Sequence, residues 1–143
     1  MIIDTKFSGQ IEINDEDIIY FEEGLLGFED AKKYVVINLD EATPFRSLQS
    51  VEKSEVAFIV INPWDIFTDY EIDIDDNELL SLGDIDIKNF MLYTLVTITE
   101  NRITTNLIGP VIINVNSRKG KQTVLYKSSY TTRHDIISLI KKV

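Results

Sequence analysis

The densest set of residues that could do chemistry is the acidic segment 65–86, which holds nine carboxylates and no lysine or arginine. Carboxylates bind calcium, and Asp73, Asp75 and Asn77 occupy the first, third and fifth positions of the spacing typical of calcium loops. The sixth position, however, is Glu78, where such a loop needs a glycine in order to turn. An aspartate also stands where the loop needs a bidentate glutamate. We therefore expect no metal site in this segment.

Other catalytic arrangements have little support in the sequence. His134 is the only histidine and there is no cysteine, so a zinc site or a nucleophilic triad would depend on a single imidazole. Gly24 and Gly27 lack the lysine and the preceding strand of a phosphate-binding loop. The many carboxylates leave one enzymatic alternative open, an acidic carbohydrate-active or other hydrolytic β-domain, which would need two carboxylates with separated pKa values in a deep cleft. We predict that the chain is not an enzyme and uses no cofactor.

The acidic segment also carries apolar residues between its acids, which is typical of a protein-docking surface. Apolar side chains supply affinity, whereas exposed charges mainly set the association rate and the specificity. The interleaved apolar residues are Ile66, Phe67, Tyr70, Ile72, Ile74, Leu79 and Leu82. The same pattern fits an amphipathic edge strand and helix that acids keep in solution, and both interpretations stay open. A structural subunit of a larger assembly is a third alternative, which would associate permanently through a large apolar patch.

Charge is distributed unevenly along the chain, whose net charge is −10. Residues 1–100 contain 23 acids and 6 bases, a balance of −17, whereas residues 101–143 contain 1 acid and 8 bases, a balance of +7. A negative field repels phosphate backbones and attracts basic proteins. We expect basic protein partners and no direct binding of nucleic acid, and we interpret the basic C-terminal part mainly as charge balance.

Length and composition favour a single domain over residues 1–143. A chain of 143 residues has the usual size of one domain, and its 44% hydrophobic and 27% charged residues are typical of a globular fold. The absence of cysteine fits the cytoplasm. Asp4 interrupts any signal sequence, and no run approaches the ~20 apolar residues of a membrane span. We expect a cytoplasmic protein that is monomeric when free.

Period-two alternation and short β-branched runs predict a mainly β fold. The expected strands cover Phe7–Asn14, Tyr34–Leu39, Ala57–Ile61, Met91–Thr99, Val111–Val115 and Gln122–Tyr126. The last two form a hairpin through the basic tip Ser117–Gly120. One short helix is expected over Asp76–Gly83, where an aspartate or an asparagine caps the start and a glycine ends it. A C-terminal helix is expected over Thr132–Lys142, because its isoleucines recur at helical spacing.

Several runs of residues resemble, in order, the motifs of one known family. They are Gly24–Glu29, Pro44–Ser50, Phe58–Pro63 and Thr105–Asn114. Gln122, Tyr130 and Arg133 extend the match, so that it covers nearly the whole chain. In these motifs the chain resembles FliW, the bacterial flagellar assembly factor. The resemblance implies a compact, antiparallel, β-barrel-like single domain.

The resemblance also implies a cytoplasmic regulator with two mutually exclusive protein partners. One is flagellin, and the other is CsrA, a small RNA-binding dimer that represses the translation of flagellin messenger. Capture of CsrA would relieve this repression, either by covering its RNA-binding surface or by binding elsewhere and disfavouring RNA. The resemblance favours the second mode.

Two groups of residues are candidates for partner binding. The electrostatic candidates for CsrA are Glu71, Asp73, Asp75, Asp76 and Glu78. Phe45, Gln49 and Asn106 belong to the motifs, and core packing or backbone hydrogen bonds explain them equally well. Asn106 and Asn114 are asparagines of the kind that bond to backbone groups at strand ends.

Overall fold

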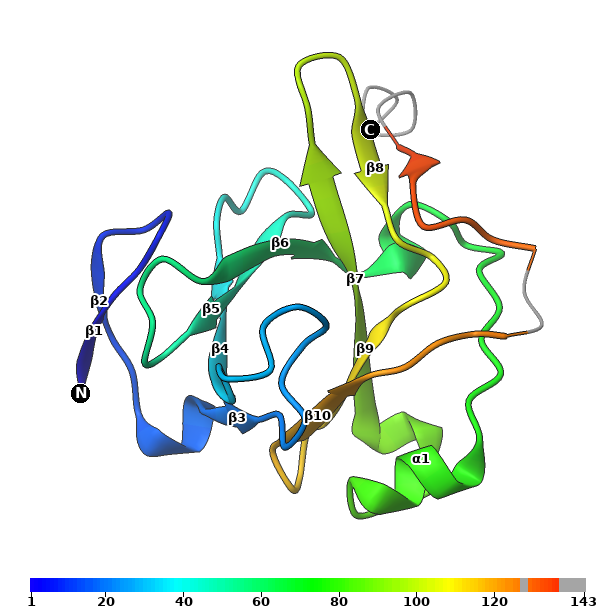
Figure 1. The fold of residues 1–143 in the computed structure, drawn as a ribbon, viewed down its shortest axis with the longest axis horizontal. Helices are drawn as coiled ribbons and strands as arrows, with labels where there is room; N and C mark the ends of the chain where they lie inside the picture. Colours follow the sequence, from blue (N-terminus) through cyan, green and yellow to red (C-terminus); the bar gives the residue numbers. More distant parts are fainter. Residues whose placement is uncertain (127–128, 137–143) are drawn as a thin grey trace.

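In the computed structural model, which describes residues 1–126 and 129–136, most of the strands belong to one sheet that closes on itself (Figure 1). The strands of this ring are β3 (Ile19–Tyr20), β4 (Lys33–Asn38), β5 (Arg46–Ser50), β6 (Ala57–Ile61), β7 (Phe90–Ile98), β9 (Val111–Asn114) and β10 (Lys119–Gln122). Neighbours in the ring follow the order β7-β6-β5-β4-β3-β10-β9, and β9 pairs back with β7. The predicted mainly β, barrel-like fold is confirmed.

The length of β7 is what allows the ring to close. Its first half pairs with β9 through Phe90–Tyr93, and its second half pairs with β6 through Thr94–Val96. The ring is antiparallel except where β10 meets β3, at the single parallel pair of Lys119 and Tyr20. The strand expected over Met91–Thr99 therefore joins the two edges of the sheet.

The remaining elements attach to the outside of this ring. β8 (Ile103–Thr105) pairs with the end of β7, and β11 (His134–Asp135) pairs with β8. A separate hairpin consists of β1 (Ile2–Asp4) and β2 (Gln10–Glu12). The helical elements are the short helix α1 (Asp76–Ser81) and the 3-10 turns η1 (Asp15–Asp17), η2 (Pro63–Asp65) and η3 (Ile87–Asn89). None of the helices within the described ranges is long and apolar enough to cross a membrane.

Alternation along the strands divides the core into an inner and two outer clusters. On β4, Tyr34 and Val36 belong to the inner cluster, whereas Val35 and Ile37 belong to the cluster under the β1-β2 hairpin. On β9, Val111 and Ile113 likewise belong to the inner cluster. The connection from β3 to β4 crosses the opening of the ring in Figure 1, and its Leu25 and Ala31 join the inner cluster. The interior is therefore filled by side chains.

The short predicted helix is confirmed: an aspartate caps its start, one residue before the predicted range, and a glycine follows its end as predicted. The Asp75 side chain accepts a hydrogen bond from the backbone N–H of Asn77 at 2.9 Å, which satisfies one of the free donors of the first turn. Gly83, just past the helix, has a φ of +112°, a conformation that glycine adopts without strain. The sequence of this segment therefore determined the helix locally.

The C-terminal helix expected over Thr132–Lys142 is wrong in its described part. Residues 132–133 form a turn, and β11 then pairs with β8, after which the backbone N–H of Ile136 donates to the carbonyl of Ile103 at 2.9 Å. The open edge of β8 supplies these partners, so tertiary pairing overrides the helical spacing. Residues 137–143 lie outside the described residues.

The predicted hairpin forms, but its second strand begins and ends earlier than expected. β10 starts at Lys119, directly opposite Asn114, and ends at Gln122, so Thr123–Tyr126 lies outside the sheet. The Asn114 side-chain oxygen accepts the backbone N–H groups of Asn116 and Ser117, which tightens the turn and lets the strand return early. The first predicted strand is also shorter, because Thr5–Gly9 turns the chain between β1 and β2.

Two glycines with similar φ values provide a matched test of how closely the connection from β3 to β4 packs in the opening of the ring. Gly24 has a φ of +66°, and a Cβ built on it would lie 2.6 Å from the Cα of Glu29, whereas Gly9 has a φ of +63° and open space around it. We expect Gly9→Ala to lower the free energy of unfolding by about 1 kcal/mol through backbone strain alone. Gly24→Ala should lower it by about 1–3 kcal/mol more, because backbone atoms have to move. Urea unfolding of both variants measures this, and an equal loss of unfolding free energy in the two would contradict close packing of the connection from β3 to β4.

Candidate functional site

Of the acidic candidates, Glu71, Asp73 and Asp75 stand on an extended segment between Tyr70 and α1, and Asp76 and Glu78 belong to α1 itself. Tyr70 anchors the start of this segment: its hydroxyl donates to the carbonyl oxygen of Leu107 at 2.7 Å, and its own carbonyl accepts the indole N–H of Trp64 at 2.8 Å. The backbone N–H of Glu71 donates to the Tyr130 hydroxyl at 2.9 Å. Contacts from distant parts of the chain therefore fix where the segment begins.

The segment has the alternation of a strand without lying in a sheet. Ile72 and Ile74 are half-buried and pack against the outer cluster around Leu79 and Leu125, whereas Glu71 and Asp73 are exposed. In an extended chain, successive side chains point to opposite sides, so burial of the isoleucines turns the acids outward. The strand-like pattern read from the sequence thus has its expected effect on side-chain direction, although the described residues pair no strand with it.

These acids line an open groove of about 760 Å³. Two segments far apart in the sequence form it, one running from residue 71 into α1 and the other following β10. The lining residues are Glu71, Ile72, Asp73, Asp75, Glu78, Val124, Leu125, Tyr126, Ser129 and Tyr130. We call this surface the acidic groove. It combines exposed carboxylates with apolar and aromatic contact area, and Tyr126 is 91% exposed.

One carboxylate of the acidic groove is compensated from the basic C-terminal part of the chain. Glu78 lies 3.4 Å from the ammonium of Lys121, and its other oxygen accepts a hydrogen bond of 2.5 Å from the Thr123 hydroxyl. The remaining acids are not compensated in this way: among the described residues, neither Glu71 nor Asp73 forms an ion pair. The negative field of the groove is therefore reduced at one end and kept along the extended segment.

The other acidic candidates stand at the entry to α1. Asp75 lines the groove and also caps the helix through its side chain, so it has a structural role besides its charge. Asp76 is exposed in the first turn, where a negative charge is favourable near the helix N-terminus. The structure thus brings Glu71, Asp73, Asp75 and Glu78 together around one groove, with Asp76 beside it.

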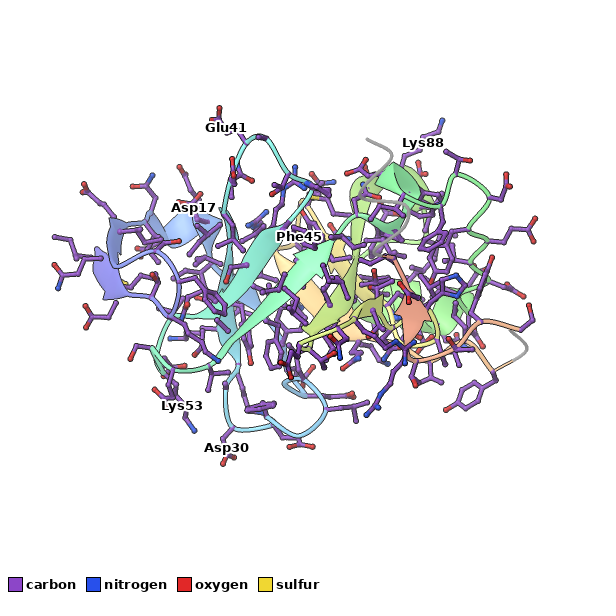
Figure 2. The ribbon with its side chains drawn as sticks, turned by 90° about the horizontal axis from the view of Figure 1, so that it is seen from above. Asp17, Asp30, Glu41, Phe45, Lys53 and Lys88 are labelled. Carbon is purple, nitrogen blue, oxygen red and sulfur yellow. The ribbon has the colours of Figure 1, made fainter. Side chains whose placement is uncertain are left out.

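The motif candidates lie elsewhere, and two of them hydrogen-bond to the backbone. Gln49 on β5 is fully buried: its side-chain oxygen accepts the backbone N–H of Lys6 at 2.9 Å, and its amide donates to the carbonyl of Ser54 at 3.1 Å. The Asn106 side-chain oxygen accepts the backbone N–H groups of Ile108 and Gly109 at 3.0 and 2.9 Å. Phe45, labelled in Figure 2, is half-buried just before β5.

Sequence reasoning missed the second segment of the groove. The sequence predicts that Val124–Tyr126 belongs to a strand, and it marks Tyr130 only as a motif residue. The ring of Tyr130 lies 4.9 Å from that of Tyr70, which ties this segment to the acidic one. The sequence signal that was available is the pair of tyrosines in a basic stretch, but nothing in their spacing shows that they lie opposite the acids.

The geometry of the described residues gives little support to a metal site or a catalytic site. No cluster of three or more potential metal ligands occurs among residues 1–126 and 129–136. The His134 ring packs edge-on against Phe67, with 4.8 Å between ring centroids, on a strand outside the groove. The groove carboxylates stand at exposed or half-buried positions, unlike the desolvated pair that a glycosidase needs. The arrangement is suited to docking.

Comparison with known proteins gives consistent results. The family model described as FliW protein matches residues 2–136. The flagellar assembly factor FliW of Bacillus subtilis is 42% identical over 138 residues, which cover 95% of this chain and 96% of the relative. That of Natranaerobius thermophilus is 42% identical over 141 residues, covering 96% and 93%. A crystal structure of the flagellar assembly factor FliW matches with a TM-score of 0.90 and 40% identity, covering 96% of this chain and 97% of that one.

Buried tyrosines, one of them beneath the groove, predict a loss of stability at alkaline pH. Burial raises the pKa of Tyr34 from 10.0 to about 12. Burial, and to a lesser extent the charge of Tyr130, raises the pKa of Tyr70, and burial also raises that of Tyr93. Below about pH 10 both states keep these protons; above it the unfolded state releases them first, so stability falls as pH rises, by up to about 1.4 kcal/mol per pH unit for each such tyrosine.

Urea unfolding from about pH 8 to about pH 11, followed together with tyrosinate absorbance, measures this slope. Tyr70→Phe should give a shallower slope, because one of the contributing hydroxyls is gone. Tyr126→Phe, at a 91% exposed position, should keep the slope of the parent protein. An identical slope in all three proteins would show that Tyr70 does not contribute.

Proposed function

Because this chain belongs to the FliW family of flagellar assembly factors, we propose that it binds and antagonises the translational repressor CsrA, relieving repression of flagellin synthesis, and alternatively binds flagellin. In this role it is a cytoplasmic regulator that exchanges protein partners and makes or breaks no covalent bond. The acidic groove is the proposed docking site for CsrA.

The observation that supports this proposal is the combination of charge and contact area in the acidic groove. A protein that binds RNA has to present positive side chains to phosphates, so its surface is complementary to a groove lined by Glu71, Asp73 and Asp75. The charges steer the encounter, because the net charge of the whole chain is −10. Affinity comes from apolar and aromatic contacts, for which Ile72 and Tyr126 are available in the same groove.

The dimensions of the groove favour the indirect mode of antagonism. A volume of about 760 Å³ accommodates a few side chains or one extended segment of a partner, which is much less than a whole RNA-binding surface. Once docked, the strongly negative chain would raise the electrostatic cost of bringing RNA to the same CsrA dimer. CsrA would thus lose RNA through repulsion and geometry without having its RNA site covered.

Competition between the two partners tests the function directly. Calorimetric titration of the pure protein with CsrA and with flagellin should give a complex in each case. Titration of the preformed CsrA complex with flagellin should release CsrA, because the partners are mutually exclusive. A stable ternary complex would contradict partner switching, and failure to bind CsrA at all would contradict the proposed function.

Reversal of two groove charges tests the proposed docking site. Glu71→Lys combined with Asp73→Lys leaves the helix cap Asp75 intact and should slow association with CsrA about tenfold or more at low ionic strength. The rates of the variant and the parent protein should converge at high salt, because screening removes the steering. Stopped-flow association at several salt concentrations measures both effects.

A matched control separates the position of the charges from the net charge. Asp30 and Glu41, labelled in Figure 2, are exposed and line no part of the groove. Asp30→Lys combined with Glu41→Lys changes the net charge by the same amount and should slow association much less. Equal slowing by both pairs would mean that overall charge attracts CsrA and that the groove has no special part in it.

A further inference from the structure

A second cavity, of about 590 Å³, lies between β3, β10 and the end of α1, elements that are neighbours in the lower part of Figure 1. Residues of three separate parts of the chain line it. They are Tyr20, Phe21, Glu22, Glu23, Lys32, Ser81, Leu82, Lys119, Gly120 and Lys121. We call it the lysine pocket. Its size is within the range of about 300–1,000 Å³ that is typical of sites for small organic ligands.

The chemistry of the lysine pocket suits an anion with an apolar body. Three lysines and two glutamates line it, so the lining residues alone carry a positive balance in a chain that is otherwise strongly acidic. Lys32 is held in place, because its ammonium donates to the carbonyl oxygen of Glu22 at 2.6 Å, and an ammonium has further donors for a ligand. The half-exposed ring of Tyr20 and the small accessible part of Leu82 supply apolar contact, over the buried ring of Phe21.

The lysine pocket and the acidic groove share one ion pair. Lys121 lines the pocket, Glu78 lines the groove, and the two lie 3.4 Å apart. α1 and the residues after it also contribute to both sites, through Glu78 on one side and Ser81 and Leu82 on the other. An anion in the pocket competes with Glu78 for Lys121, and a cation in the groove competes with Lys121 for Glu78.

From this geometry we propose that the lysine pocket binds a small organic carboxylate with an aromatic or aliphatic body, and that its occupation releases Glu78 into the acidic groove. The ligand carboxylate bonds to Lys119 and Lys121, and the apolar body contacts Tyr20 and Leu82. Glu78, no longer neutralised, adds its charge to Glu71 and Asp73. Ligand binding in the pocket is independent of the proposed function. Tighter binding of CsrA in the presence of the ligand rests on the proposed function.

The size of the coupling follows from the exposure of the shared pair. The side chains of Lys121 and Glu78 are 25% and 30% exposed, so solvent weakens their attraction. An ion pair of this kind changes an equilibrium by about two- to fivefold. Coupling is reciprocal, so removal of Glu78 as a competitor should strengthen ligand binding in the pocket by the same factor.

Three probes test the pocket on the free protein by amide NMR titration. Phenylacetate carries the required carboxylate and ring, phenethylamine has the same ring with the opposite charge, and acetate has the charge without the ring. We expect phenylacetate to shift the amides of Tyr20, Phe21, Lys119 and Lys121, and both other probes to bind much more weakly. Phenethylamine binding as tightly as phenylacetate, or shifts confined to other parts of the chain, would overturn the proposal.

Three variants test the shared ion pair with the same titration. Lys121→Gln should weaken phenylacetate binding about three- to tenfold, because a charge-assisted hydrogen bond is lost. Glu78→Gln, which can still accept the Thr123 hydroxyl, should strengthen it about two- to fivefold. Lys53→Gln removes an exposed lysine that lines neither site and should change nothing.

Unchanged binding in Lys121→Gln, or weaker binding in Glu78→Gln, would contradict the shared role of this pair. All of these measurements use the protein without CsrA or flagellin. A failure here therefore leaves the proposed function standing, and a failure of the CsrA experiments leaves the pocket standing.

Discussion

The double pairing of β7 is the constraint on which the rest of the structure depends. One strand bonds to β9 with its first half and to β6 with its second, and this turns an open sheet into a closed ring. Closure removes exposed sheet edges within the ring and encloses a core filled by Tyr34, Leu48, Val60 and their neighbours. Because side chains fill the interior, binding surfaces have to form on the outside, from the segments that connect and follow the strands.

Both surface sites form where connecting segments pack on the outer face of the ring. The acidic segment and the stretch after β10 bury Ile72, Ile74 and Leu125 in one outer cluster. This packing holds an acidic segment next to a segment of the basic C-terminal part. The chain therefore does not cancel its acidic field as a whole. It neutralises Glu78 through Lys121 and leaves Glu71 and Asp73 exposed. Under the two proposals, the exposed acids attract the basic partner and the Glu78–Lys121 pair couples the two sites.

Two of the motif residues that carry the family resemblance serve mainly to build this frame. Gln49 ties the β1-β2 turn and the Ser54 region to β5, and Asn106 bonds to the backbone after β8. Each satisfies backbone groups that would otherwise be costly to bury. These two motif residues therefore support the fold, whereas the proposed partner contacts lie on the acids and tyrosines of the acidic groove.

Local sequence determined the features whose causes are local. β6 coincides with the run Ala57–Ile61, and α1 forms where a short helix is predicted, with its cap Asp75 one residue before the predicted range. The alternation of acids and isoleucines turned Glu71 and Asp73 outward. Tertiary structure decided what depends on distant partners. The free edge of β8 made His134–Asp135 a strand in place of a helix, and the Asn114 turn shifted β10 by several residues. It also placed Tyr126 and Lys121 beside the acids, because packing across more than forty residues of sequence leaves no periodic signal in either segment.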